Sequence, residues 1–319
     1  MAPLSSQQTA VAGAVRAAVT GALERDGVAL LPPLDAGQTL ALCAAAGIQA
    51  RCTLLDPWYN KGAGGVRDDY GAFVGGLLEG AAALSDHVYL WGFPEIVAGL
   101  VGHLPSGLSL VAWLTWYYKN NPSVIRGWRS AQMTCLHLSR PGAPLHPEHF
   151  LNQAQLDKLA AGKLRYLPGP PSVLEGHPDV IEESLLVGFV GRAEQTGHPA
   201  QKPRAVIDKL LLMVLEGPEV VVDPMCGSGT TGASALALGH RAVLADHSPE
   251  FTALTARRLG IEPVELPAGS FGLLGGPGPD GPGTAPAGGG AGGSGRGSRA
   301  GPGSIAPETP GRLPSGLTG

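Results

Sequence analysis

The chain has 319 residues, of which 22 are lysine or arginine and 26 are aspartate or glutamate, so its formal net charge is -4. This balance excludes a protein that coats nucleic acid through bulk charge, although it is compatible with a local basic groove. The four cysteines form no Cys-x-x-Cys pair and no apolar run approaches the length of a membrane span, so the sequence predicts a cytoplasmic protein with reduced thiols.

The first part of the chain is predicted to alternate helices and strands. An alanine-rich stretch over 6–25 has apolar residues at helical spacing and indicates a peripheral helix, within a lead-in over 1–49. Short apolar runs that end in turn residues indicate strands, and a helix over 69–85 is predicted between the first two. The predicted strands are 52–56, 87–93, 108–118 and 132–139. This alternation is typical of βαβ units.

The second part of the chain begins with an irregular segment over 141–197, whose prolines, glycines and polar residues show no sustained period. We expect it to be an insertion carried on the main sheet. A helix is then predicted over 203–216, and residues 220–246 read as a strand, a glycine-rich turn, a helix and a strand. A last helix is predicted to begin after Ser248 and to end near Gly260.

The composition changes at residue 268. From there to 319 the chain is glycine, proline, alanine and serine with scattered charges. Such a segment has too little apolar surface to offset the entropy of ordering it, so a disordered tail is predicted. The remaining residues, about 265, suffice for the core of one α/β domain.

The glycine-rich turn follows the pattern G-x-G-x-x-G at Gly227, Gly229 and Gly232, and Asp246 ends the next strand. Glycines let a ligand approach the backbone, helix amides point at it, and a carboxylate can accept two hydrogen bonds from a ribose diol. A nucleoside-bearing cofactor is therefore predicted, and tight-turn glycines without a ligand are the alternative. Only one strand and one helix follow before the tail, so the remaining strands must come from upstream, as in a circularly permuted sheet.

A second motif, LLDPWYN over 54–60, places an acid, a proline and an aromatic after a predicted strand. Asp56 and the carbonyl of Pro57 can accept both N–H bonds of an exocyclic amine, which localises its lone pair toward an incoming methyl group. Tyr59 can stack on the base, and such stacking contributes about 1–3 kcal/mol. An Asp-Pro turn with buried aromatics is the alternative for this motif alone.

Three blocks together carry a resemblance: DPWYN at 56–60, GHPAQKP at 197–203 and DPMCGSGTTG at 223–232. In this order they resemble the beta class of S-adenosylmethionine-dependent DNA amino-methyltransferases, over residues 50–260. The resemblance implies a Rossmann-like α/β methyltransferase fold with a mostly parallel, circularly permuted, seven-stranded sheet and a small inserted target-recognition region. The implied parts are a catalytic half (50–140), the target-recognition insertion (141–197) and a cofactor-binding half (198–267).

The resemblance also implies a reaction and its residues. A site-specific DNA methyltransferase would move a methyl group from S-adenosylmethionine to the exocyclic amine of a flipped adenine, without a metal. The implied catalytic residues are Asp56, Pro57, Trp58 and Tyr59. The implied cofactor-binding residues are Asp223, Pro224, Cys226, Gly227, Gly229, Thr230, Asp246 and Lys202. Trp58 stands where the family has a second proline, which adds bulk beside the target pocket and loosens the backbone that aims the carbonyl of Pro57.

The target and partners remain partly open at this point. Aspartate as the first catalytic residue favours adenine, and the alternatives are cytosine-N4, RNA or protein glutamine methylation, or a catalytically silent nucleic-acid-binding relative. DNA is the expected partner, and the sequence leaves open a homodimer and a cognate restriction endonuclease. The glycine-rich loop over 61–70 is interpreted either as a loop that closes over the extruded base or as a plain surface linker. The two histidines of HPEH over 146–149 have a spacing compatible with metal binding, but without a further ligand cluster the segment is interpreted as a surface turn. The expected DNA contacts are Arg126, Arg129, Arg140, Lys158, Lys163 and Arg165.

Overall fold

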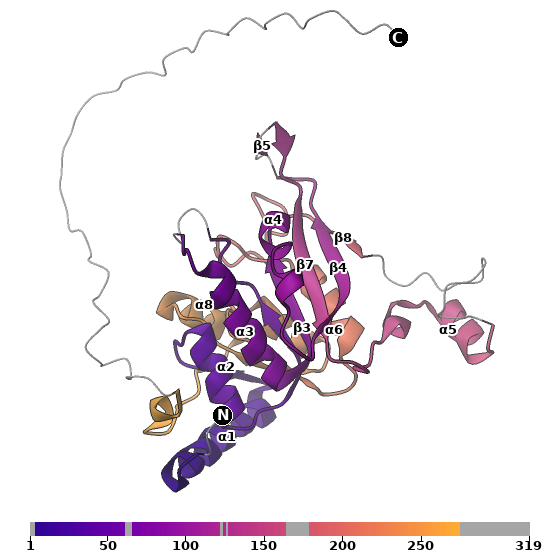
Figure 1. The fold of residues 1–319 in the computed structure, drawn as a ribbon. Helices are drawn as coiled ribbons and strands as arrows, with labels where there is room; N and C mark the ends of the chain where they lie inside the picture. Colours follow the sequence, from indigo (N-terminus) through magenta and orange to yellow (C-terminus); the bar gives the residue numbers. More distant parts are fainter. Residues whose placement is uncertain (1–3, 61–65, 122–123, 126, 164–178, 275–319) are drawn as a thin grey trace, which may run out of the picture. The chain divides into compact units, whose positions relative to one another are not determined.

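The computed structural model describes residues 4–60, 66–121, 124–125, 127–163 and 179–274 (Figure 1). Its helices are α1 (Ser6–Asp26), α2 (Ala36–Ala45), α3 (Tyr70–Leu84), α4 (Pro94–Val97), α5 (Gln153–Ala160), α6 (Arg204–Val214), α7 (Thr230–Ala237) and α8 (Pro249–Leu259). Its strands are β1 (Val28–Leu30), β2 (Ala50–Leu55), β3 (Ser85–Gly92), β4 (Ser109–Tyr117), β5 (Val124–Ile125), β6 (Trp128–Arg129), β7 (Gln132–Ser139), β8 (Val180–Glu182), β9 (Val220–Asp223) and β10 (Arg241–Leu244). Three 3-10 turns are η2 (Val101–His103), η3 (Pro147–Phe150) and η4 (Ser270–Leu274).

Eight strands form one sheet in the spatial order β1-β10-β9-β2-β3-β7-β4-β8. β7 is antiparallel to both of its neighbours, and every other neighbouring pair in this sheet is parallel. The central strands β9 and β2 come from distant parts of the chain, which is the permutation that the late glycine loop predicted. The mostly parallel Rossmann-like sheet is therefore confirmed, with one strand more than the seven expected.

Two edge strands were not predicted from the sequence. β1 comes from the lead-in and pairs with β10, and β8 comes from the insertion and pairs with β4. Each has only three residues, which is too short for a period of two to stand out. The lead-in and the insertion are thus both parts of the same sheet.

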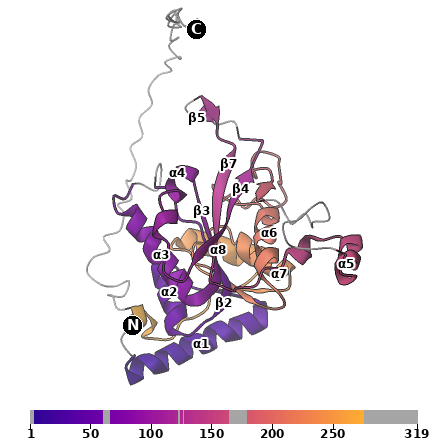
Figure 2. The same ribbon diagram turned by 45° about the vertical axis from the view of Figure 1, so that its right-hand side comes forward.

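Successive strand residues face two hydrophobic cores, one on each side of the sheet. Val88 and Leu90 of β3 face the core that α1, α2 and α3 complete. Tyr89 and Trp91 face the core that α6 completes. Figure 2 shows α2 and α3 on one side of the sheet and α6 and α7 on the other. The sheet is therefore covered on both faces, as parallel strands require.

Local signals explain where the predicted helices begin and end. Ser5 and Gln8 form a capping box at the start of α1. Ser248 accepts a hydrogen bond from the Phe251 amide at 3.3 Å, and Gly260 follows α8 with φ 66°. The predicted helices at α1, α3, α6, α7 and α8 are confirmed. α2 was not predicted, because within the lead-in a helix was assigned only to residues 6–25.

The first residues of the predicted tail are ordered. Residues 268–274 contain η4, which packs beside α1 and α2, and Ser270 is only 1% exposed. Phe271, Leu273 and Leu274 contact the core, so this short stretch has enough apolar surface to be ordered. The rest of the predicted tail, 275–319, lies outside the described residues, as do 61–65 of the expected base-closing loop.

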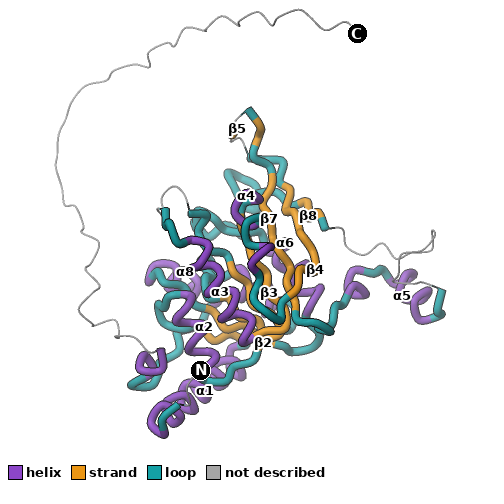
Figure 3. The backbone as a smooth tube through the Cα atoms, viewed as in Figure 1, coloured by secondary structure: helices purple, strands orange, loops and turns teal. Residues whose placement is uncertain are grey.

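The sheet has one edge at which β2, β3, β9 and β10 all end, because these strands run parallel. The hairpin of β5 and β6 extends beyond the ends of β4 and β7 (Figure 3). None of the helices in the described part of the chain has the length and apolar character needed to cross a membrane. The open carboxyl edge is where α/β sheets bind ligands.

Candidate active site

The two predicted motifs meet at this carboxyl edge. β2 and β9 are paired in parallel, with Thr53 opposite Val222, so the residues that follow both strands emerge side by side. A cavity of about 760 Å³ lies there. It is lined by Asp56, Pro57, Trp58 and Tyr59 from one motif, and by Pro224, Met225, Gly227 and Asp246 from the other side. Two segments that are distant in the sequence thus line one cavity.

Asp56 is held on both of its carboxylate oxygens. Lys202 Nζ forms an ion pair with Oδ2, and the Tyr59 hydroxyl donates to Oδ1 at 3.2 Å. Lys202 is 6% exposed, and its ammonium lies 4.8 Å from the centre of the Trp91 ring. A buried ammonium is costly unless it is paired, so the carboxylate and the ring compensate for its lost hydration. Lys202, which the resemblance implied as a cofactor-binding residue, thus lies against the implied catalytic residue Asp56.

Tyr59 is oriented by two further contacts. Its ring meets that of Phe93 edge-on, with centroids 4.7 Å apart, and its hydroxyl lies 3.2 Å from the sulfur of Met133. Burial, together with the nearby Asp56 carboxylate, raises the pKa of Tyr59 well above its usual value. The hydroxyl therefore remains a proton donor to Asp56 at neutral pH.

Trp58 packs toward α3. Its ring centre lies 5.5 Å from that of Tyr70 and 5.2 Å from that of Phe73. The Tyr70 hydroxyl donates a hydrogen bond of 2.6 Å to the Trp58 carbonyl. The bulk expected beside the target pocket is thus partly absorbed by α3, and a hydrogen bond fixes the backbone where the family has a second proline.

The glycine loop is closely packed against α8. Gly229 has φ 73°, and a Cβ at this position would lie 2.8 Å from Thr255 Cγ2. The Gly227 amide donates to Asp246 Oδ2 at 3.0 Å, and the Ser248 amide donates to Oδ1 at 2.8 Å. A residue with a Cβ at position 229 would be strained by the positive φ and would clash with Thr255, so this position requires glycine. Asp246 is fixed by two amides and still lines the cavity.

Asp223 is the last residue of β9, and its carboxylate holds the glycine loop through hydrogen bonds. Its carboxylate accepts hydrogen bonds from the Thr231 hydroxyl at 2.5 Å and the Met225 amide at 3.0 Å. Burial raises the pKa of Asp223 to about 7. Cys226 is also buried, with its sulfur 3.7 Å from the Thr255 hydroxyl, and burial raises its pKa well above the usual value. Both side chains line a small cavity, about 50 Å³, that also touches Asp56 and Lys202.

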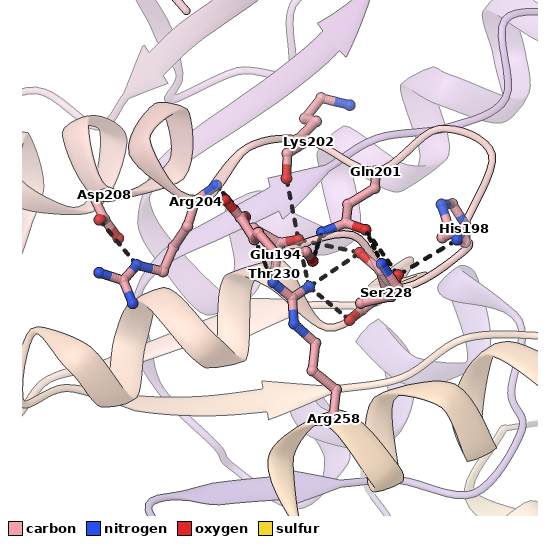
Figure 4. Close-up of polar contacts among 10 residues, drawn as sticks. Glu194, His198, Gln201, Lys202, Arg204, Asp208, Ser228, Thr230 and Arg258 are labelled. Carbon is pink, nitrogen blue, oxygen red and sulfur yellow. Dashed lines mark hydrogen bonds and ion pairs between the residues drawn. The ribbon is translucent and has the colours of Figure 1, made fainter. Parts of the chain in front are cut away.

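Arg258 is a site residue that the sequence analysis missed. Its Nη1 donates to the Ser228 carbonyl and to the Thr230 hydroxyl, each at 2.9 Å (Figure 4). The Thr230 hydroxyl in turn donates to the Lys202 carbonyl at 3.2 Å. Burial lowers the pKa of Arg258. The pair Arg257-Arg258 at the end of a helix reads as two solvated charges, so no sequence signal distinguished the buried one.

The same network holds the segment that carries Lys202. Glu194 lies 3.6 Å from Arg258 Nη2, and its carboxylate accepts the Arg204 amide at 2.7 Å (Figure 4). Gln201 donates to the Glu194 carbonyl at 2.8 Å. Arg258 and Glu194 thus link the segment before α6 to the glycine loop. The Thr230 hydroxyl belongs to the same network, because it accepts from Arg258 and donates to the Lys202 carbonyl.

Several further residues line the larger cavity, and apart from Arg67 of the 61–70 loop they were not predicted as site residues. Phe251 and His198 are two of them, with ring centres 4.3 Å apart. The others are Asp35, Ala36, Gly37, Gln38, Arg67, Phe73, Ala200 and His247. Asp35 is the N-cap residue of α2, so an element missed in the sequence supplies part of the wall.

The expected DNA contacts do not converge in the described residues. β7 is antiparallel to β3, with Ser139 opposite His87, so Arg140 lies at the sheet edge opposite the cavity. Its guanidinium bonds to the Ala82 carbonyl there. Arg129 lies on the hairpin, and Lys158 lies on α5. Lys163 follows α5, whereas Arg126 and Arg165 lie outside the described residues.

Comparisons with known proteins agree with this geometry. Residues 105–257 match the model of the N6/N4 family described as DNA methylase. The type II methyltransferase M.HpaI of Haemophilus parainfluenzae is 24% identical over 156 residues, which are 49% of this chain and 47% of that protein. The DNA adenine methyltransferase YhdJ of Escherichia coli K12 is 35% identical over 68 residues, 21% of this chain and 23% of that protein. The chain thus matches less than half of the length of either relative.

Two solved structures share the fold. The M1.HpyAVI–SAM complex has a TM-score of 0.55 at 17% identity, covering 73% of this chain and 100% of the other. The cytosine-N4-specific PvuII DNA methyltransferase has a TM-score of 0.51 at 16% identity, covering 78% and 91%. The predicted fold is confirmed, and the matching family model supports the family that the three motif blocks resemble.

Proposed function

We propose that this chain, a member of the N6/N4 amino-methyltransferase family, transfers a methyl group from S-adenosylmethionine to an exocyclic amine of a base in DNA. One observation carries the proposal: the DPWYN motif and the glycine loop line the same cavity. Methyl transfer requires that the amine nitrogen contacts the methyl group of the donor, and its rate depends mostly on how the two reactants are positioned. A cavity shared by an amine-binding motif and a nucleoside-binding loop meets that requirement.

The residues present suit S-adenosylmethionine. A cavity of about 760 Å³ lies within the range of about 300–1,000 Å³ usual for small-molecule sites. Asp246 uses one lone pair of each oxygen on an amide, so the others are available to ribose hydroxyls. Gly227 and Phe251 line the same cavity, and the Phe251 ring offers an apolar surface to the adenine of the cofactor. The bound cofactor supplies an activated sulfonium methyl group.

Asp56, Pro57 and Tyr59 would act on the base. The Asp56 carboxylate and the Pro57 carbonyl accept the N–H bonds of the amine, which keeps its lone pair directed at the methyl group. Lys202 and Tyr59 occupy two of the roughly four acceptor positions of Asp56, so they orient the carboxylate without filling it. A duplex hides the amine, so the base must first be extruded at a cost of a few kcal/mol.

We further propose adenine-N6 as the target. Aspartate at position 56 supports adenine through the resemblance, and the relative YhdJ is named a DNA adenine methyltransferase. The structurally similar PvuII enzyme is named cytosine-N4-specific, so the two products must be separated experimentally.

The test is methyl transfer from radiolabelled S-adenosylmethionine into DNA by the full chain, followed by nucleoside analysis. We expect label in N6-methyladenine. Label in cytosine alone would reverse the target, and label only in RNA or protein, offered in parallel, would reassign the substrate. Absence of label in every substrate refutes the transfer.

Asp56→Ala is the decisive variant in this assay. It removes the acceptor for the amine, so transfer should fall by roughly 10²–10³-fold or more, while the cofactor Kd should change less than about threefold. Glu24→Ala, at an exposed carboxylate of α1 that does not line the cavity, is the control and should retain full activity. A fully active Asp56→Ala variant contradicts the assigned role.

A further inference from the structure

A cluster of three metal-binding side chains lies at the sheet edge opposite the cavity. His146, Glu148 and His149 each offer one ligand atom, and these atoms lie within 4.8 Å of one another. They follow β7, whose last residue, Ser139, pairs with the beginning of β3, which places the cluster away from the proposed methyl-transfer site. Sequence spacing alone gave a surface turn, because it did not show that the glutamate and both imidazoles converge.

The backbone already holds this segment against the end of α6. The His146 amide donates to the Met213 carbonyl at 2.8 Å, and His149 Nδ1 bonds to the Leu212 carbonyl at 2.8 Å. The Leu212 bond assigns the proton of His149 to Nδ1, which leaves Nε2 with a free lone pair. Histidine ligands of metals usually make such a bond with their second nitrogen, since it fixes both tautomer and orientation.

The side chains are arranged face to face across the turn. The rings of His146 and His149 are stacked with centroids 5.2 Å apart, and Glu148 Oε1 lies 3.1 Å from His146 Nδ1. Pro147 opens the η3 turn and restricts its backbone. His146 is 7% exposed, whereas His149 is exposed. One ligand is thus anchored in the protein and another is accessible to an incoming ion.

We propose that His146, Glu148 and His149 bind one zinc ion, which fixes the conformation of the η3 turn that is hydrogen-bonded to the carboxyl-terminal end of α6. Two imidazoles and one carboxylate form a donor set that suits Zn²⁺, with a fourth position left for water. The ligand atoms need only a small contraction of the turn to reach a common ion. The zinc site lies away from the proposed methyl-transfer site, and zinc binding is measured without a methylation assay. Failure of either proposal can therefore be distinguished from failure of the other.

The chain provides a matched control in His103. This histidine is also exposed, and its Nδ1 also bonds to a backbone carbonyl, that of Gly99 at 3.2 Å. It belongs to no metal-binding group among the residues that the structure describes. His103→Ala therefore removes an accessible histidine of the same kind without touching the cluster.

The experiment uses the full chain, purified without a polyhistidine tag and stripped of metal by a chelator that is then removed. Zn²⁺ is titrated in competition with a chromophoric chelator, and thermal midpoints are recorded with and without Zn²⁺. We expect one equivalent to bind and to raise the midpoint. Glu148→Gln and His149→Ala should each weaken binding at least tenfold, whereas His103→Ala should stay within twofold.

Two results would overturn the proposal. One is the absence of a one-to-one zinc site in the stripped wild-type protein. The other is equal zinc affinity in the wild type and His149→Ala, which would mean an adventitious ion only. The metal-free thermal midpoints show whether each variant is folded, and Glu148→Gln keeps the side-chain shape, so a loss of binding there does not reflect unfolding.

Discussion

The glycine loop (223–232) and the insertion (141–197) are both rich in turn residues, yet the fold treats them in opposite ways. Every residue of the loop except Met225 is buried, and its polar groups are bonded to α8, β10 and the segment before α6. In the described part of the insertion only His146 and Ile181 are buried. Packing therefore fixes the conformation of the loop, whereas most side chains in the described part of the insertion remain at least partly exposed. Substitutions in the loop should consequently cost more stability than substitutions in the insertion.

The largest difference should come from one glycine in each region. Gly229 and Gly162 have similar φ values, 73° and 67°, but a Cβ would clash with Thr255 only at Gly229. Gly229→Ala should lose about 3 kcal/mol or more of unfolding free energy, from left-handed strain and overpacking together. Gly162→Ala should lose about 1 kcal/mol, from strain alone. Urea unfolding measures both, and equal losses would contradict the role of crowding.

The link between Arg258 and the loop should produce the next largest effect. Arg258→Met removes the donors to Ser228 and Thr230, and hydrogen bonds to a charged group contribute about 1.5–3 kcal/mol. We expect the cofactor Kd to rise about tenfold, measured by calorimetry, with partial rescue in Arg258→Lys.

Arg257→Met is the control for this effect, because Arg257 is the exposed neighbour on the same helix. It should leave cofactor affinity unchanged. If Arg258→Met lowers the thermal midpoint but leaves the Kd unchanged, Arg258 supports the fold and does not position the loop.

A third effect depends on pH. Burial raises the pKa of Asp223 from 3.8 to about 7, so between these values the folded state binds more protons than the unfolded state. Its contribution to stability is therefore present at low pH and is lost as pH rises through about 7. From pH 5 to 8 the wild type should lose on the order of 1–3 kcal/mol relative to Asp223→Asn. Thermal midpoints of both proteins across this range measure it, and a constant difference would mean that Asp223 is ionised throughout.

The smallest effect on stability should come from the surface of the insertion. Phe189 is 87% exposed, so Phe189→Ser should change the unfolding free energy by less than about 0.5 kcal/mol. If the insertion recognises DNA, the same variant should weaken DNA binding severalfold in a fluorescence anisotropy titration, with cofactor affinity unchanged. Unchanged DNA affinity would remove Phe189 from the recognition surface.

The features that the sequence could predict are those encoded by local patterns of residues, and the features that it could not predict depend on tertiary contacts. The sheet, five of the helices and both motifs are encoded in contiguous residues, because caps, periodicity and glycine spacing are local signals. The pairing of Lys202 with Asp56 joins residues 146 positions apart, and Arg258 acts from a helix with no motif. Such contacts depend on tertiary packing, which no short pattern contains. The three-residue strands β1 and β8 are likewise defined by their neighbours.

The short strand β1 has a consequence for how the chain can be divided. It lies twenty residues upstream of β2 in the chain but covers the outer side of β10. A fragment that starts at Ala50 would keep every proposed catalytic and cofactor residue, yet it would present a bare row of β10 amides and carbonyls to solvent. Such rows act as templates for strand addition between molecules. Trimming the protein to its recognisable motifs would therefore favour aggregation.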